Sequence, residues 1–171
     1  MKTLKPKTVS DSAVRHQVYK VFLNDLNANR TVFGGLVMSQ LDRIASVVAE
    51  RHSGHTCVTA SVDALHFLAP AHEGDVLFYQ ASINKAWNSS MEIGVRVSSE
   101  NPKTGEREHI VSAYFTFVAI NKAGKPMPVP EAIPETAIEK RRYADAEVRR
   151  EVRKRESKNR RERHKQEHPE V

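Results

Sequence analysis

Residues 34–54 read GGLVMSQLDRIASVVAERHSG, and this stretch decides the fold because it carries the one long amphipathic pattern ahead of the tail. Its apolar residues recur at spacings of four, three and four: Val37, Leu41, Ile44 and Val48. This spacing places them on one face of an α-helix. With Gly54 as a typical stop signal, the pattern predicts one helix from about Gly35 to Arg51.

Strand-like runs occupy most of the remaining sequence up to residue 120. The run QVYKVFL (17–23) precedes the helix and leads into a loop rich in Asn and Asp. Four more runs follow the helix at about 56–68, 76–87, 89–100 and 109–120, separated by turn residues. Within 91–98 apolar residues alternate strictly with polar residues or glycine. This alternation predicts a strand with one face packed against the core and one face nearer to solvent.

This order of elements, one strand, one helix and four strands, indicates a fold class. A lone helix has to bury its apolar stripe on the sheet, and the short links between the last strands favour antiparallel neighbours. We therefore predict an α+β fold, with an antiparallel sheet of five to six strands wrapped around one long central helix. One helix cannot cover both faces of the sheet, so we expect a second copy to cover the other, in at least a dimer.

Length and composition indicate one domain with an appendage. The chain has 171 residues with 39% hydrophobic content, which is enough for a single buried core without disulfide bonds or a structural metal. The single cysteine, Cys57, cannot form an internal disulfide. Because the sequence has no apolar run suited to a signal peptide or a bilayer span, we expect a cytoplasmic protein without membrane association.

The excess positive charge lies in the tail. Residues 1–139 hold 14 Lys and Arg against 14 Asp and Glu, whereas residues 140–171 hold 13 against 7. The tail contains possible i, i+4 ion pairs and a thin apolar stripe formed by Ala144, Val148 and Val152. We interpret it as a solvated basic helix that frays. Nucleic-acid binding is disfavoured, because Tyr143 is the tail's one aromatic residue and offers little to stack bases.

The segment LNANRTVFGGLVMSQLD (26–42) holds the densest group of candidate functional residues. Gly34 and Gly35 leave backbone N–H groups open at a helix start, where an anion or oxyanion can bind, although a tight turn also explains the pair. Asp42 lies at the rim of the apolar face, a position that suits a general base or an aspartate bonded to a strand. Asn27 and Asn29 either cap the loop or hold a water or carbonyl.

Other chemistries find less support. The sequence contains no GxSxG, P-loop, GxGxxG or CxxC motif. His52, His55 and Cys57 lie close together but have no fourth ligand at usable spacing, so we predict no metal site. No cofactor is implied.

Several segments in order resemble the acyl-coenzyme A hydrolases of the hotdog superfamily, both bacterial and eukaryotic. The resemblance runs from about His16 to Arg150 and is carried by NANRTVFGGLVMSQLD, VTASVDALHFLAP with EGDV, SSMEIGVRV, AYFTFVAINKAGKPMPVP and PETAIEKRRYADAE. It implies a hotdog thioesterase domain at 16–133, between an N-terminal extension (1–15) and a charged C-terminal helix with a frayed tail (134–171).

The resemblance also implies roles for individual residues. Asp42 matches the catalytic carboxylate of the family, which acts as base or nucleophile. Asn27 matches an active-site asparagine that meets the carboxylate of another subunit. The Gly35 amide would be the oxyanion donor. Coenzyme A, which is part of the substrate, would contact Gly34, Phe67 to Pro70, Trp87, Asn88, Ser89 and Ser90. Relatives assemble as hexamers built from dimers, and they often have Gly where this chain has Arg30.

Three rival functions remain. An acyl dehydratase or hydratase would use His66. A non-catalytic acyl-coenzyme A sensor would need a DNA-binding module, for which the stretch before the first strand is too short. A nucleic-acid-binding protein would depend on the basic tail, residues 155–171.

Overall fold

The computed structural model describes residues 4–167 of the chain. Its strands are β1 (Lys7–Thr8), β2 (Val14–Lys20), β3 (Thr56–Val62), β4 (Val76–Ala86), β5 (Ser90–Glu100), β6 (Arg107–Ile120) and β7 (Ala132–Ile133). Its helices are α1 (Gly34–Ser53), α2 (Ala137–Glu167) and the short 3₁₀ turns Val9–Asp11 and Leu23–Asp25. No helix in this part of the chain is long and apolar enough to cross a membrane.

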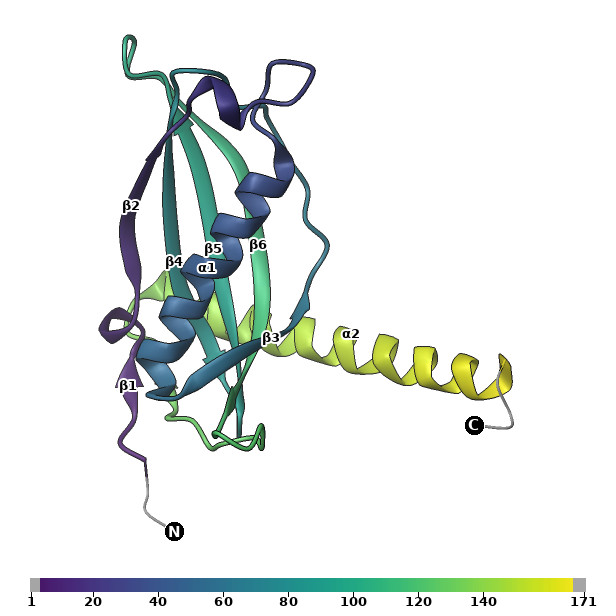
Figure 1. Ribbon diagram of the computed structural model, residues 1–171. Coiled ribbons are helices and arrows are strands. Elements are labelled where there is room, and N and C mark those ends of the chain that lie inside the picture. The colour runs from purple at the N-terminus through teal and green to yellow at the C-terminus, as the bar shows by residue number, and fades with distance from the viewer. Residues whose placement is uncertain (1–3, 168–171) are drawn as a thin grey trace.

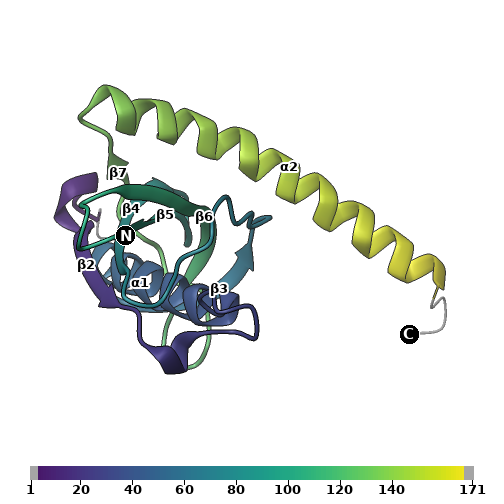
Figure 2. The same cartoon turned by 90° about the horizontal axis from the view of Figure 1, so that it is seen from above.

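The main sheet has five strands in the order β2-β4-β5-β6-β3, with antiparallel neighbours throughout. It curls around α1, and the long α2 lies outside it (Figures 1 and 2). The predicted fold class is confirmed, as is the order of one strand, one helix and four strands. The strand predicted at 17–23 instead spans Val14–Lys20, because residues 23–25 form a 3₁₀ turn. The strand predicted at 56–68 ends at Val62, because residues 63–70 are irregular. His66 therefore lies in an irregular segment and not on a strand.

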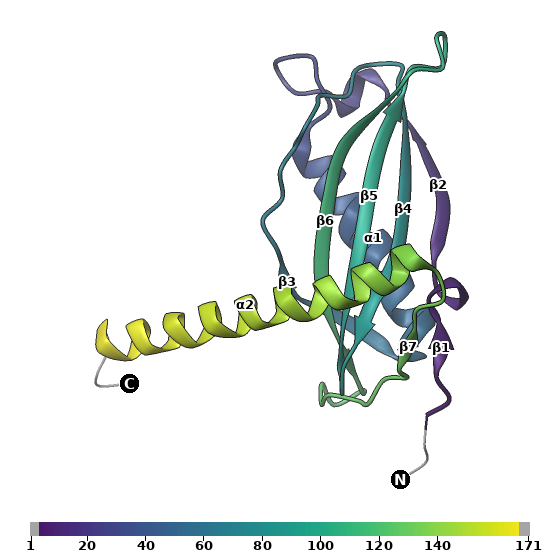
Figure 3. The same cartoon turned by 180° about the vertical axis from the view of Figure 1, so that it is seen from behind.

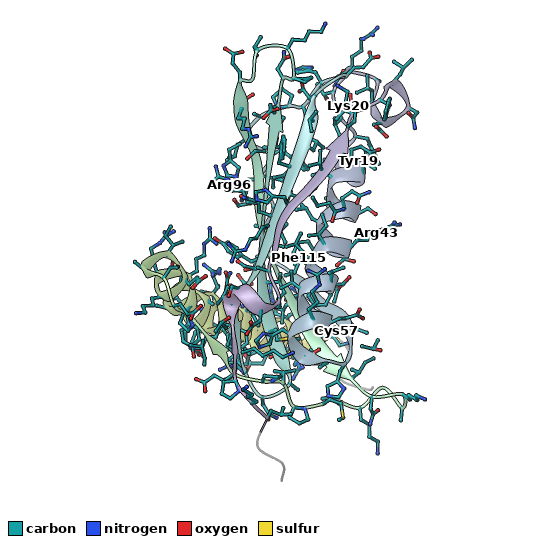
Figure 4. The ribbon with its side chains drawn as sticks, turned by 90° about the vertical axis from the view of Figure 1, so that its left-hand side faces the viewer. Tyr19, Lys20, Arg43, Cys57, Arg96 and Phe115 are labelled. Atoms are coloured by element: carbon teal, nitrogen blue, oxygen red, sulfur yellow. The ribbon has the colours of Figure 1, made fainter. Side chains whose placement is uncertain are left out.

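The core lies between α1 and the concave face of the sheet. The predicted stripe of α1 is buried, with Leu41 and Val48 fully enclosed and Val37 and Ile44 nearly so. Burying each such side chain stabilises the fold by roughly 1.5–3 kcal/mol. Figure 4 shows Arg96 on the face of the sheet away from α1 and Arg43 on the solvent side of α1. The strands thus present one apolar and one polar face, as the alternation in 91–98 predicted.

The C-terminal helix α2 crosses the outer face of the sheet, where a second copy was expected. Figure 3 shows it passing over β4, β5 and β6 and running on beyond β3. The predicted apolar stripe is turned away from the sheet: Val148 is 67% exposed and Val152 38%. Ala146 is fully buried instead. The stripe is thus exposed, as in a solvated helix, but the other side of α2 packs on the sheet, and that side is selected by charge.

A buried carboxylate on β5 holds α2 in place. Glu92 is fully buried, and its oxygens accept hydrogen bonds from Arg149 at 2.6 Å and from Arg153 at 2.7 Å. Arg153 also donates to Asp63, just past the end of β3, at 2.8 Å and 3.0 Å. Arg149 stacks on the Tyr114 ring at 3.8 Å. Because a buried charge is costly unless it is paired, these contacts make α2 part of the folded body.

The N-terminal residues close the other end of α1. β1 pairs in parallel with β7, and Val9 is buried against the core. The Lys7 ammonium donates to the carbonyl oxygens of Arg51 and His52, both at 2.8 Å. A cation at these last carbonyls stabilises the negative end of the helix.

Replacing both anchoring arginines, in the variant Arg149→Met/Arg153→Met, should lower the free energy of unfolding by about 3–5 kcal/mol, because Glu92 then stays buried without a cation. The control Arg155→Met/Arg160→Met removes the same charge from exposed positions of α2 and should change it by less than about 0.5 kcal/mol. Urea unfolding at one protomer concentration measures both. Equal losses in the two variants would contradict the buried network.

Candidate active site

The N-terminus of α1 presents open backbone amides beside two aromatic rings. Phe33 caps the helix, and its carbonyl accepts from the Leu36 and Val37 amides at 3.0 Å and 3.5 Å. Within the described residues, the amides of Gly34 and Gly35 donate to no protein acceptor. Such first-turn N–H groups, at the positive end of the helix dipole, suit an anionic oxygen.

Gly35 lies tightly against a neighbouring ring, whereas Gly34 has room for a side chain atom. A Cβ on Gly35 would come within 2.4 Å of the Phe33 ring, so a larger residue would displace that ring. A Cβ on Gly34 would lie 3.5 Å from the Phe67 ring. The structure therefore brings Gly34 and Phe67 together, as a shared substrate surface would need, and the half-exposed Phe67 ring covers the helix start.

Asp42 lies further along α1, next to the edge strand β3. The Asp42 side chain is partly buried, and its Oδ1 accepts a hydrogen bond of 2.7 Å from the Thr59 hydroxyl. Ala45 and Ala49 beside it on the helix are fully buried, whereas Met38 is 49% exposed. Asp42 thus occupies the rim between the core and the open side of α1. A structural aspartate would make the same bond to β3.

Thr59 has no distinguishing signal in the sequence. It is one of several exposed polar residues in β3, within the run TCVTASV. Its partner lies 17 residues earlier in the chain, so the contact depends on how α1 packs against β3. Thr59 could have been found only by predicting that α1 packs beside β3, the strand that follows it.

Asn27 is bound within its own loop. Its Oδ1 accepts from the Asn29 and Thr31 amides at 2.9 Å and 3.2 Å, and its Nδ2 donates to the Thr31 hydroxyl at 2.9 Å. No hydrogen bond joins it to Asp42 in the described part of the chain. Arg30 has φ = 58°, a left-handed conformation that favours glycine and explains why Gly suits this position.

Asp25 fixes the loop to the body and was not predicted. Its carboxylate accepts from the Tyr19 hydroxyl and the Phe22 amide, both at 2.8 Å, and its carbonyl accepts from the Phe33 amide at 2.8 Å. These bonds connect β2, the Asn27 loop and the helix start. Asp25 therefore determines where both Asn27 and the glycines lie.

The remaining predicted substrate residues form two separate groups. Pro70 is exposed and follows Phe67 near the start of α1. The turn of Trp87, Asn88, Ser89 and Ser90 joins β4 to β5 at the end of the sheet where α1 finishes (Figure 1). There Trp87 donates from its ring to Glu147 of α2 at 3.0 Å. Within one chain, the two groups lie at opposite ends of the sheet.

The edge strand β3 is open along one side. Among the residues that the structure describes it pairs with β6 alone, and its outer residues Val58 and Val62 are 43% and 46% exposed. An open edge with exposed apolar residues is a surface on which another strand can pair. Because Thr59 belongs to this strand, a chain that pairs there would lie next to Asp42.

The residues near the end of α1 form no metal site in the structure. Among the described residues, no three His, Cys, Asp or Glu side chains are grouped as ligands. His52 is fully buried, and its Nε2–H donates to the Pro130 carbonyl at 3.0 Å. Since a carbonyl can only accept, the proton is on Nε2 and leaves Nδ1 unprotonated, without a partner. Cys57 contacts the Ser53 hydroxyl at 3.2 Å.

Comparisons with known proteins identify the class. The family described as Thioesterase superfamily matches residues 29–106. An uncharacterized acyl-CoA thioester hydrolase of Bacillus subtilis is 43% identical over 120 residues, 70% of each chain. The chain therefore belongs to the hotdog acyl-CoA thioester hydrolases of the thioesterase superfamily.

Two solved structures resemble the whole body. A hexameric acyl-CoA thioesterase without ligand superposes with a TM-score of 0.87 at 38% identity, over 90% of this chain and 98% of that one. The acyl-CoA hydrolase of Staphylococcus aureus, in complex with butyryl coenzyme A and coenzyme A, gives 0.83 at 38% identity, over 91% and 96%. That enzyme has also been solved with an aspartate, an asparagine or a threonine replaced by alanine.

Stability should depend on pH through His52. Burial lowers the pKa of His52 below its ordinary 6.5, so the folded chain keeps it neutral at a pH where the unfolded chain protonates it. This contribution is complete above about pH 6.5 and is lost as pH falls from there toward the lowered pKa of the folded state. Urea unfolding at about pH 7.5 and about pH 5.5 should show a smaller loss for His52→Gln than for the wild type; an identical loss would contradict this role.

Proposed function

We propose that Asp42 is the carboxylate with which this chain hydrolyses acyl-CoA thioesters to a carboxylic acid and coenzyme A. The observation that carries the proposal is the placement of Asp42 on α1, partly buried and held by Thr59, two turns beyond a helix start with open amides. Membership of the acyl-CoA thioester hydrolases supports the reaction class. No cofactor is required, because a carboxylate, a water and an oxyanion site suffice.

The reaction would begin with the thioester carbonyl at the start of α1. The Gly35 amide would donate to the carbonyl oxygen and stabilise the negative charge that develops there. Asp42 would either remove a proton from the attacking water or attack the carbonyl itself to give an anhydride. The Thr59 hydroxyl occupies Oδ1, and within the described residues Oδ2 accepts no hydrogen bond, so Oδ2 is the oxygen available to react.

A second chain would complete the site. Asn27 is directed into its own loop and does not reach Asp42 of the same chain, whereas the β3 edge beside Asp42 is open. Pairing of two chains along β3 would cover Val58 and Val62, and it would bring another Asn27 loop toward Asp42. The hexameric relative of known structure supports an assembly of three such dimers.

The same assembly would reconcile the two groups of substrate residues. Phe67 and Gly34 of one chain would contact the acyl end of the substrate, and the turn of Trp87 to Ser90 would contribute from another chain. The butyryl coenzyme A complex of the Staphylococcus aureus enzyme supports a ligand of this kind. That enzyme's aspartate, asparagine and threonine variants match the residue types of Asp42, Asn27 and Thr59. We place the protein in the cytoplasm, consistent with its single free thiol, Cys57.

Replacing Asp42 by Asn should reduce turnover of acyl-CoA by at least about a hundredfold, because the amide can neither accept the water's proton nor attack. Release of free thiol from a series of short to long acyl-CoA esters measures this. The control Glu50→Gln changes the same charge at an exposed position of α1 and should be fully active. Normal turnover by folded Asp42→Asn would refute the role, and coenzyme A binding without any hydrolysis would favour the sensor function.

Thr59→Val should lower kcat by roughly tenfold or more, since it removes a hydrogen bond to a charged group that orients Asp42. Thr59→Ser keeps the hydroxyl and should retain most of the activity. Steady-state kinetics on both variants measures the difference. If Val and Ser at position 59 gave the same kcat, Thr59 would have no part in orienting the carboxylate.

A further inference from the structure

The second half of α2 extends past the body of its own chain. Arg153 binds Asp63 just past the end of β3, and Figure 3 shows the helix running on beyond that strand. Between residues 154 and 163, the hydrogen bonds and ion pairs of the described side chains join residues of α2 only. Because most of the stability of a helix in a protein comes from packing, this extension lacks a contact that the first half of α2 has.

One face of α2 carries a stripe that runs through both halves of the helix. Its members recur every three or four residues: Asp145, Val148, Val152, Glu156, Asn159 and Arg163. This spacing places them on a single face of the helix. Val148 and Val152 are both exposed, so the stripe is turned away from the sheet and leaves apolar surface in contact with water.

The two ends of the stripe carry opposite charges. Asp145 begins it and Arg163 ends it, and within the described residues neither makes an ion pair. The Arg163 side chain donates only to the Asn159 carbonyl, at 3.4 Å. If two such stripes lie antiparallel, the acid of each faces the base of the other. The stripe is therefore complementary to itself, as a two-fold contact between identical chains requires.

The open edge of β3 determines the register of such a contact. A two-fold axis between chains paired along β3 passes beside that strand, and Arg153 is the α2 residue bound at its end. Residues equally far before and after the axis then face each other. The midpoint between positions 145 and 163 is Lys154, which adjoins Arg153.

The extension is long enough to reach a second chain. From Lys154 to Arg163 the helix advances about 14 Å, at about 1.5 Å per residue. Neighbouring strands lie about 4.8 Å apart, so this length corresponds to nearly three strands of an adjoining sheet. A chain paired along β3 continues the sheet in this direction, and its outer face lies under the extension.

We propose that α2 packs antiparallel against α2 of the chain paired along β3, on the face of the sheet opposite α1. The occupant of the stripe is thus a second copy of this chain. Asp145 pairs with the partner's Arg163 twice in each dimer, and the contact covers Val148 and Val152. The inference rests on the pairing of two chains along β3 in the proposed function, and it gives the basic extension a role that needs no nucleic acid.

Disulfide cross-linking tests this contact. In a Cys57→Ser background, which removes the native thiol, Asp145→Cys/Arg163→Cys should form a covalent dimer on mild oxidation, visible on a non-reducing gel. Within one helix the two positions lie about 27 Å apart, so they cannot be bridged inside a chain. The control Asp145→Cys/Arg161→Cys puts the second cysteine on the opposite face of α2 and should give less than about a tenth of that product.

A further variant, Val58→Asp/Val62→Asp, disrupts the β3 edge and should abolish the cross-link. A cross-link that persisted in it would place the contact between other chains and overturn the proposal. Equal products from the stripe variant and its control would mean random collision. No product, in an assembly that light scattering shows to be a dimer or larger, would refute the α2 contact alone, and a monomeric wild type would refute the β3 pairing as well. The gel does not depend on hydrolysis, so an inactive wild type would refute the thioesterase function and leave the cross-link to decide the contact.

Discussion

Burial of the apolar stripe of α1 on the concave face of the sheet is the constraint on which the rest of the structure depends. Because Leu41, Ile44 and Val48 must face the strands, the rotation of the helix about its axis is fixed. That rotation puts Asp42 at the rim beside β3, where Thr59 can hold it. The same packing leaves the first-turn amides of α1 open at one end of the sheet. Burial of this stripe therefore both stabilises the fold and determines where the residues of the site lie.

A second constraint acts from the outer face. Glu92 points away from α1 into a space that would be solvent if α2 were absent, and α2 buries it completely. One of the two arginines that compensate it, Arg153, also binds Asp63, at the point where β3 gives way to the segment containing Phe67. A helix that is basic and polar in composition is thus bound to the body by charge. Its position relative to β3 therefore follows from Glu92.

The elements most readily predicted from the sequence were those with a strong period. The 3.6-residue pattern gave α1 to within about two residues at each end, and the alternation at 91–98 gave the two faces of β5. The early end of β3 could not be predicted from local pattern, and Asp63, the residue that follows it, is bound by Arg153, 90 residues further along. The packing of α2 on the sheet could not be predicted for a similar reason, since it depends on the pairing of buried Glu92 with Arg149 and Arg153. Thr59 and Asp25 act through contacts that local pattern does not reveal, and the roles of Asp42 and Asn27 came from family resemblance and stay predictions.

The central claim is that Asp42 of one chain acts with Asn27 of another. Mixing inactive Asp42→Asn and Asn27→Ala chains, by unfolding and refolding them together, tests it most directly. If each site takes its two residues from different chains, random pairing gives a mixed dimer about half the time, with one of its two sites intact, so about a quarter of the wild-type activity returns. If both residues belong to one chain, every site in the mixture has a defect. Activity no higher than that of the separate variants, in chains that demonstrably exchange partners, would contradict the account.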